Sequence, residues 1–240
     1  TRFGEEGVRA AEIVGVGGVE KYFDKMLRDP ALEGEPLKLS IDLTVQAATR
    51  QVLKDGMRLM NAKGASAILM DVNTGEIISL VSLPDFDPNN RPRAAILGDP
   101  SENPLFNRAA QGLYELGSTF KIFTAATSLE KGLVNPQTII DTTPFRWNRK
   151  TYKDYKNYGP TNSVEDIIMK SSNVGTIRMA LAAGTSAQKK TLKDLGFFEA
   201  VPVELGEASR TKPQIPKNWS DTSTITISFG HGISATPLHL

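Results

Sequence analysis

The sequence predicts a fold that mixes helices with an antiparallel β-hairpin. Two nearly all-apolar runs, 65–72 and 76–83, are joined by Asn73-Thr74-Gly75, a turn sequence typical of hairpins. Because both runs are apolar on both faces, we expect the hairpin to be central in its sheet. Residues 122–129 carry no charged side chain, which predicts a helix that is buried nearly all round.

The elements before the hairpin follow from turns, caps and periodicity. Residues 19–27 can form a short helix, and residues 37–41 read as a short strand. A helix begins at Asp42 or Thr44 and runs to about Met60. Its expected apolar face consists of Val45, Ala48, Val52 and Leu59 or Met60.

The second half of the chain reads mainly as helices. Ser163 caps a helix that extends to Lys170, and further helices end at Gly184 and Gly196. Residues 135–159 look irregular, with a solvated loop or short hairpin at 146–156. Residues 222–229 alternate toward a strand but remain ambiguous, and Thr236-Pro237 resembles the start of a helix.

Composition excludes several classes of function. The 240 residues carry a net charge of +1, so nothing favours binding to nucleic acid or to an anionic membrane. The chain has no cysteine, which excludes disulfides. With no cysteine and only two histidines, its composition disfavours a zinc site. No apolar run approaches the roughly 18 residues of a membrane span. Thr1 is not an initiator residue, so we expect the chain to be a fragment.

The strongest chemical signal is Ser118 followed three residues later by Lys121. The apolar run after Lys121 places this lysine at the start of a buried helix. Burial and the helix dipole both disfavour a lysine cation there. Ser118 lies about one turn earlier on the same face. A serine beside a desolvated lysine is a nucleophile with its base.

The Ser-x-x-Lys spacing also has a non-catalytic interpretation, because it can arise by chance. Ser128/Lys131, Ser186/Lys189 and Ser209/Lys212 repeat the spacing, and we expect them to be solvated surface residues. Likewise, Ser171-Ser172-Asn173 lies between two predicted helices, where hydroxyl and amide side chains often serve only as caps.

Several motifs in the same order resemble the penicillin-binding proteins. The nearest resemblance is to the class B, division-type (septal, FtsI-like) D,D-transpeptidases, and it covers nearly the whole chain. The matching stretches are Leu39-Ser40-Ile41-Asp42, Asn107-Arg108-Ala109, Gly117-Ser118-Thr119-Phe120-Lys121, Ser171-Ser172-Asn173-Val174-Gly175 and Ser228-Phe229-Gly230-His231-Gly232.

The resemblance implies a mixed α/β fold of the serine β-lactamase and penicillin-binding transpeptidase type, with an antiparallel sheet flanked by helices. It implies a linker or pedestal remnant at 1–36 and a transpeptidase domain at 37–240. The sequence departs from the family at Ser172, where aspartate is common, and at Leu116, where proline is common. No Lys-Thr-Gly or Lys-Ser-Gly occurs, so we expect a domain truncated before its third motif.

The resemblance also implies a role for each site residue. Ser118 would attack the penultimate D-alanine of a peptidoglycan stem peptide, and Lys121 would take the Ser118 proton. Ser171 would relay a proton to the leaving amine, while Asn173 and Ser172 would bind substrate. The mechanism requires no metal and no cofactor.

Partners and location are expected from the same resemblance. They are peptidoglycan stem peptides, β-lactam antibiotics and divisome membrane proteins, at the periplasmic face of the bacterial inner membrane, without nucleic acid. We expect no membrane anchor within this stretch of sequence. Two alternatives stay open: a serine β-lactamase, and a non-catalytic penicillin-recognising sensor or scaffold module.

Overall fold

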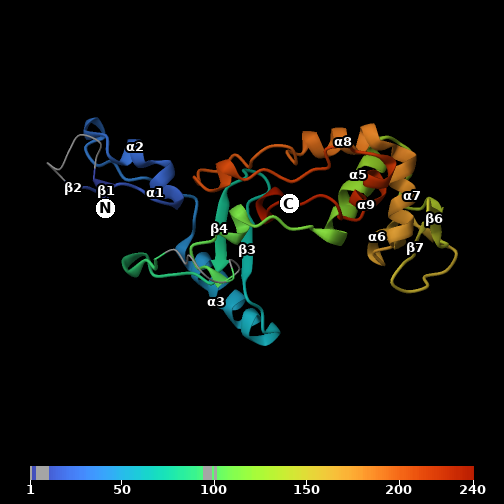
Figure 1. Ribbon diagram of the computed structural model, residues 1–240, viewed down its shortest axis with the longest axis horizontal. Coiled ribbons are helices and arrows are strands. Elements are labelled where there is room, and N and C mark those ends of the chain that lie inside the picture. Colours follow the sequence, from blue (N-terminus) through green and yellow to red (C-terminus); the bar gives the residue numbers. More distant parts are fainter. Residues whose placement is uncertain (1, 4–10, 94–98, 100–101) are drawn as a thin grey trace. The chain divides into compact units, whose positions relative to one another are not determined.

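The computed structural model describes residues 2–3, 11–93, 99 and 102–240 (Figure 1). The chain forms two compact units, which are taken separately below. Unit 1 consists of residues 1–113, 200–212 and 236–240, and unit 2 consists of residues 114–199 and 213–235. The predicted domain boundary after residue 36 lies inside unit 1 and stays a prediction.

A β-hairpin is the centre of unit 1. Strands β3 (Ala65–Met70) and β4 (Ile77–Leu83) pair antiparallel, with Ala65 opposite Leu83. The Asp71 carboxylate closes the turn by accepting from the backbone N–H groups of Asn73 and Thr74. The predicted hairpin is therefore confirmed. Among the described residues these strands form a two-stranded sheet, so the expected central position in a wider sheet is not observed.

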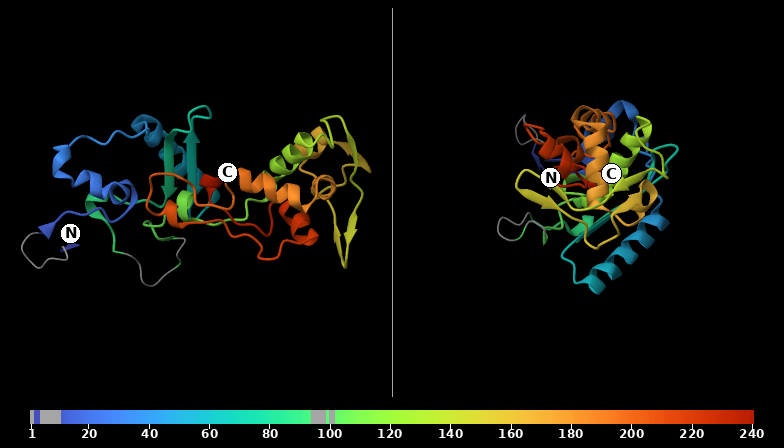
Figure 2. Two further views of the ribbon diagram at one scale, coloured as in Figure 1. Left: turned by 90° about the horizontal axis from the view of Figure 1, so that it is seen from above. Right: turned by 90° about the vertical axis from the view of Figure 1, so that its right-hand side faces the viewer.

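Helices lie on both faces of this hairpin (Figures 1 and 2). On one face lies helix α3 (Leu43–Met60), whose Gln46 Oε1 accepts a hydrogen bond from the Ser79 hydroxyl. Helix α4 (Arg108–Gln111) donates its first N–H to the Ser82 hydroxyl. Ser79 and Ser82 are three residues apart on one strand and so point to opposite faces. The expected antiparallel sheet with flanking helices is thus present.

The predicted cap of α3 is correct, but its predicted apolar face is wrong. Asp42 Oδ1 accepts from the N–H of Val45 at 2.9 Å, as an N-cap should. However, Val52 is 74% exposed and Leu59 is 81% exposed. The Gln46 amide bonds to the backbone of Leu80 through both its oxygen and its nitrogen. The half-buried face of the helix instead carries Val45, Thr49, Leu53 and Met57, so only Val45 of the predicted face is correct.

The N-terminal part of unit 1 is mostly irregular. The predicted helix at 19–27 is divided into α1 (Gly18–Tyr22) and α2 (Asp24–Leu27), with Phe23 between them. The predicted strand at 37–41 is wrong, because this stretch passes the start of β4 without forming a ladder. The remaining short elements of unit 1 are β1 (Arg2–Phe3), β2 (Ala11–Glu12), η1 (Pro30–Leu32), η2 (Pro88–Asn90), η5 (Ala208–Arg210) and η6 (Pro237–His239).

Unit 2 is built around five helices. They are α5 (Lys121–Glu130), α6 (Val164–Met169), α7 (Asn173–Ala183), α8 (Thr185–Asp194) and α9 (Asp221–Ile227), preceded by the 3₁₀ turn η4 (Gly117–Phe120). The helices predicted to begin after Ser163 and to end at Gly184 and Gly196 are confirmed. The core is aromatic beside α5, where the rings of Phe120, Phe123 and Phe197 meet edge to face.

One expectation about these helices is wrong, and one stretch that the sequence left ambiguous is resolved. Helix α5 is not buried all round, because Ile122 is 51% exposed and Leu129 is 40% exposed. Helix α7 is buried over more than half of its residues, and its Val174 and Ile177 are fully buried. Residues 221–227 form helix α9 and not a strand. A capping box between Ser220 and Ser223 starts it, and within the helix the Thr226 hydroxyl donates back to the Thr222 carbonyl oxygen.

The strands of unit 2 are short and antiparallel. Strand β5 (Ile139–Asp141) pairs with β8 (Thr161–Ser163), and β6 (Phe145–Trp147) pairs with β7 (Lys150–Tyr152). The β6–β7 pair confirms the short hairpin expected within 146–156 (Figure 2). Across the described ranges, no helix is both long and apolar enough to cross a membrane.

Candidate active site

The centre of the candidate site is the side chain of Lys121, the first residue of α5. Only 3% of its surface is exposed. Its amine donates to the hydroxyl of Ser171 at 2.7 Å and to the Ser171 carbonyl oxygen at 2.5 Å. The structure therefore brings the first and second predicted motifs together, although 50 residues separate them in the chain.

The electrostatics of this amine favour its neutral form. Burial lowers the pKa of Lys121 from its ordinary 10.5 to about 8, and the negative charge of Asp154 partly opposes that shift. A lysine with this pKa carries a useful fraction of free amine near neutral pH, which is what a general base requires.

Ser118 lies on the exposed first turn, within η4. Gly117 just before it has φ = 57°, a left-handed conformation that glycine adopts at little cost and that turns the chain into η4. Among the described residues, the Ser118 hydroxyl makes no hydrogen bond, so it does not touch the Lys121 amine directly. Catalytic hydrogen bonds are often long in free enzymes and tighten when substrate binds.

The three residues of the second motif lie in different environments. Ser171 is exposed and has φ = 57°, so its backbone is in the left-handed region that serine seldom occupies. Asn173 is half-buried at the start of α7. Ser172 is 1% exposed; its hydroxyl accepts from the N–H of Gly175 and donates to Asp154. We therefore revise the expectation that Ser172 contacts substrate, because its side chain caps a helix.

Asp154 is a residue of this site that the sequence did not reveal. Its carboxylate accepts from the Ser172 hydroxyl at 2.7 Å and from the N–H of Val174 at 3.0 Å. It therefore fixes the corner that carries Ser171, and it is also the charge that raises the pKa of Lys121. No spacing signal could have found it, because it lies in an irregular loop that only tertiary folding brings to α7.

The turn before Ser118 is fastened to the stretch at 228–232. The N–H of Gly117 donates to the Gly230 carbonyl oxygen at 3.2 Å. Glu115 accepts from the N–H of Gly232 at 2.7 Å and contacts His231 Nδ1 at 2.9 Å. These two contacts lower the pKa of Glu115. The last of the five stretches that carry the resemblance, residues 228–232, thus packs beside the nucleophile turn in unit 2.

The repeated Ser-x-x-Lys spacings lack these features. Ser186, Lys189, Ser209 and Lys212 are exposed, as expected. Ser128 was expected to be solvated, but it is fully buried and donates to the carbonyl oxygen of Met179. Its partner Lys131 is exposed. Within the described part of the chain, no group of three or more histidine, aspartate or glutamate side chains could hold a metal ion.

Curated proteins with similar sequences carry transpeptidase names. The chain is 34% identical over 228 residues to the probable peptidoglycan D,D-transpeptidase FtsI of Caulobacter vibrioides, covering 94% of this chain and 37% of that protein. It is 34% identical over 249 residues to the peptidoglycan D,D-transpeptidase FtsI of Escherichia coli, covering 94% and 41%. The chain thus spans about two fifths of the length of these relatives.

Solved structures agree with the sequences. The apo structure of the TP domain from Burkholderia pseudomallei penicillin-binding protein 3 matches with a TM-score of 0.68 and 26% identity, covering 84% of this chain and 55% of that chain. A crystal structure of a peptidoglycan glycosyltransferase from Burkholderia ambifaria matches with a TM-score of 0.72 and 26% identity, covering 84% and 58%.

The family model described as the penicillin binding protein transpeptidase domain matches residues 65–240, which is most of the chain. The resemblance to FtsI-like transpeptidases, inferred above from short motifs, is confirmed by these matches. The chain belongs to the penicillin-binding protein transpeptidase family.

Proposed function

We propose that this protein is a serine D,D-transpeptidase that cross-links peptidoglycan stem peptides during septal cell-wall synthesis. One observation carries the proposal. A buried lysine amine with a pKa of about 8 lies one helical turn after an exposed serine, and the hydroxyl of Ser171 holds that amine at 2.7 Å. The names of the FtsI relatives support peptidoglycan as the substrate.

The acylation step follows from the chemistry of these side chains. The neutral Lys121 amine takes the proton of the Ser118 hydroxyl, and the oxygen attacks the carbonyl carbon of the penultimate D-alanine. The resulting tetrahedral intermediate carries a negative oxygen. The bond to the terminal D-alanine then breaks, and the leaving nitrogen receives a proton from the Lys121 ammonium through the Ser171 hydroxyl. The products are an acyl-enzyme on Ser118 and free D-alanine.

Deacylation reverses these roles with a different amine. The amino group of a neighbouring stem peptide attacks the acyl carbonyl, and its proton returns through Ser171 and Lys121 to Ser118. A new amide bond forms, which is the cross-link, and the enzyme is regenerated. Because the acceptor is an amine and not water, the site must favour the peptide over hydrolysis.

Neighbouring groups position the substrate in this proposal. The half-buried Asn173 amide can bind the substrate backbone, and the backbone N–H of Ser118 can donate to the developing oxyanion. Ser172 and Asp154 act as positioning residues, because their hydrogen bonds hold the corner between Ser171 and α7. We further propose the periplasmic face of the bacterial inner membrane as location and divisome membrane proteins as partners.

The decisive experiment is intact mass after incubation with penicillin G, on the protein as the cell makes it. We expect one added penicillin mass that persists for many minutes, and none in the Ser118→Ala variant. Rapid release of hydrolysed penicillin would instead identify a β-lactamase. A protein that never acquires the added mass would be a scaffold, and the proposed function would then be wrong.

A further inference from the structure

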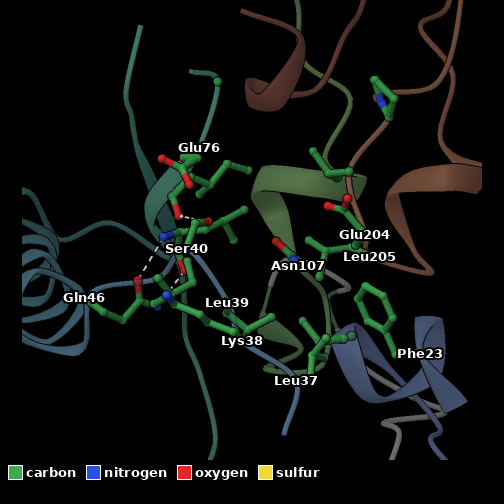
Figure 3. A pocket seen from close by; sticks show the side chains of 18 of the residues that line it. Phe23, Leu37, Lys38, Leu39, Ser40, Gln46, Glu76, Asn107, Glu204 and Leu205 are labelled. Atoms are coloured by element: carbon green, nitrogen blue, oxygen red, sulfur yellow. Dashed lines mark hydrogen bonds between the residues drawn. The ribbon is translucent and has the colours of Figure 1, made fainter. Parts of the chain in front are cut away.

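A pocket in unit 1 contains none of the residues assigned to catalysis (Figure 3). Its volume is about 730 Å³. Three separate stretches line it: the irregular chain at 37–41, the end of the hairpin around Glu76 and the chain at 202–207. Phe23 of the N-terminal region closes one side. The aliphatic side chains of the lining include Val19, Leu37, Leu39, Ile77, Leu80 and Leu205.

Four polar side chains of the lining, those of Ser40, Gln46, Asn107 and Glu207, already have hydrogen-bond partners. The amide of Gln46 bonds to the backbone of Leu80, and the Ser40 hydroxyl donates to the Ile77 carbonyl oxygen. Asn107 donates to Glu207, whose other carboxylate oxygen accepts from the N–H of Gly18. A pocket for a small metabolite normally keeps a few polar groups free to orient its ligand. The paired interior therefore disfavours a small polar ligand.

The free hydrogen-bonding groups belong to the backbone at 37–41. Within the described residues, none of the backbone N–H and C=O groups of these five residues has a hydrogen-bond partner. All five residues line the pocket, and Leu39 leaves 46% of its surface exposed. Unpaired backbone beside aliphatic pockets is how domains recognise an added peptide strand, because the main chain supplies affinity and the pockets supply specificity.

The charges at the rim indicate the kind of peptide. The carboxylates of Glu76 and Glu204 stand on opposite sides of the pocket (Figure 3). In the part of the chain that the structure describes, the Glu204 carboxylate has no partner, and the Glu76 carboxylate accepts only from the neighbouring Thr74 hydroxyl. Lys38 is the one basic side chain in the lining. Two available carboxylates against one ammonium favour a cationic ligand.

We propose that this pocket binds a short extended segment of a partner protein in which basic side chains flank alternating apolar ones. The segment pairs with the backbone of residues 37–41, places its apolar side chains between Phe23 and Leu205, and sets its basic groups beside Glu76 and Glu204. This site is separate from the chemistry proposed for Ser118.

The probes are three fluorescein-labelled peptides, acetyl-Lys-Val-Thr-Val-Lys-amide, its counterpart with both lysines replaced by glutamate, and the lysine peptide with alternate backbone nitrogens methylated. Binding is measured by fluorescence anisotropy at low salt. We expect the lysine peptide to bind at least about tenfold more tightly than either other peptide. Equal binding of all three, or no binding of the lysine peptide, would overturn the proposal.

Variants locate the binding on the protein. Glu204→Lys should weaken binding of the lysine peptide by about tenfold, because attraction becomes repulsion. Glu130→Lys, the same charge change on exposed residue 130 of unit 2, should leave it unchanged. Protein acylated with penicillin G should bind the peptide as free protein does. If Glu130→Lys weakens binding as much as Glu204→Lys, or if acylation blocks it, the pocket is not the site.

Discussion

At the scale of single residues, this site depends on an environment that lowers the pKa of one lysine, Lys121. Lys121 is 3% exposed, and its amine donates to two oxygen atoms of one residue, Ser171. Among the residues that the structure describes, no carboxylate bonds to this amine directly, and Asp154 acts on it only through its charge. Burial without a bonded counter-charge is what lowers the pKa of an amine.

The first prediction concerns the base itself. Lys121→Arg keeps the positive charge, but a guanidinium does not release its proton near neutral pH. We expect acylation by penicillin G to slow by at least about a hundredfold, the lower range for loss of general base catalysis. Lys131→Arg, the same change at an exposed position of another Ser-x-x-Lys pair, is the control and should acylate normally. Near-normal acylation by Lys121→Arg would show that a positive charge suffices.

The second prediction concerns pH. Since only neutral Lys121 can take the Ser118 proton, the acylation rate should rise as pH increases through about 8. The negative charge of Asp154 raises this pKa, so Asp154→Asn should lower it further and move the rise to lower pH. Ser172→Ala removes the hydrogen bond to Asp154 and keeps its charge, so its pH profile should stay in place. If the two variants give the same profile, Asp154 does not act through its charge.

The third prediction concerns the backbone at Ser171. Its φ of 57° costs a residue with a Cβ about 1 kcal/mol, whereas glycine adopts it freely. Ser171→Gly and Ser171→Ala both remove the hydroxyl that holds Lys121, so both should acylate slowly. Only the glycine variant escapes the backbone cost, and its free energy of unfolding should exceed that of the alanine variant by about 1 kcal/mol. Urea denaturation measures this, and equal stabilities would mean that the conformation is unstrained.

At the scale of elements, the site is formed by the N-terminal ends of two helices and by the turns that hold them in place. Helix α5 begins at the base Lys121, and α7 begins beside Ser171. The nucleophile turn is attached to the stretch that follows α9 by the Gly117–Gly230 hydrogen bond. Because this hydrogen bond joins backbone to backbone, the position of Ser118 depends on Gly117 and Gly230, although neither residue takes part in the chemistry.

The fourth prediction tests that junction. A Cβ at Gly230 would lie 2.0 Å from the Gly117 carbonyl oxygen, and φ there is 81°. Gly230→Ala should therefore lower the free energy of unfolding by roughly 2–4 kcal/mol and disturb acylation, from backbone strain plus the clash. Gly132→Ala is the matched control, because φ is 66° but nothing lies within 4 Å of its Cβ. It should cost only about 1 kcal/mol. Equal losses would mean that the close approach to Gly117 has no effect.

At the scale of the whole molecule, the chain contains four Ser-x-x-Lys pairs and only one chemical site. Lys131, Lys189 and Lys212 are exposed, and Ser128 is buried with its hydroxyl donated to Met179. Only the pair in η4 and α5 joins an exposed serine to a buried amine with a lowered pKa. The setting given by the fold, and not the spacing, selects the nucleophile.

The fifth prediction follows for the intact protein. Proteolysis and mass spectrometry of the penicillin adduct should locate all of the label on Ser118. An adduct on Ser128, Ser186 or Ser209 would contradict the assignment. Ser186→Ala changes an exposed serine with the same spacing and should leave the amount of label unchanged, which controls for substitution itself.

The sequence by itself determined the local elements and the order of the motifs. Caps at Asp42 and Ser163 and the turn at 73–75 were readable because the residues that form them lie within four positions of one another. Ser118 and Lys121 were readable for the same reason, since one helical turn joins them.

Tertiary structure alone decided the burial of α5 and the roles within the second motif. Ser172 is a cap and Asp154 an electrostatic partner because a loop 18 residues upstream folds back onto α7. Such contacts depend on which surfaces pack together in the folded chain, and the local sequence around each residue does not encode them.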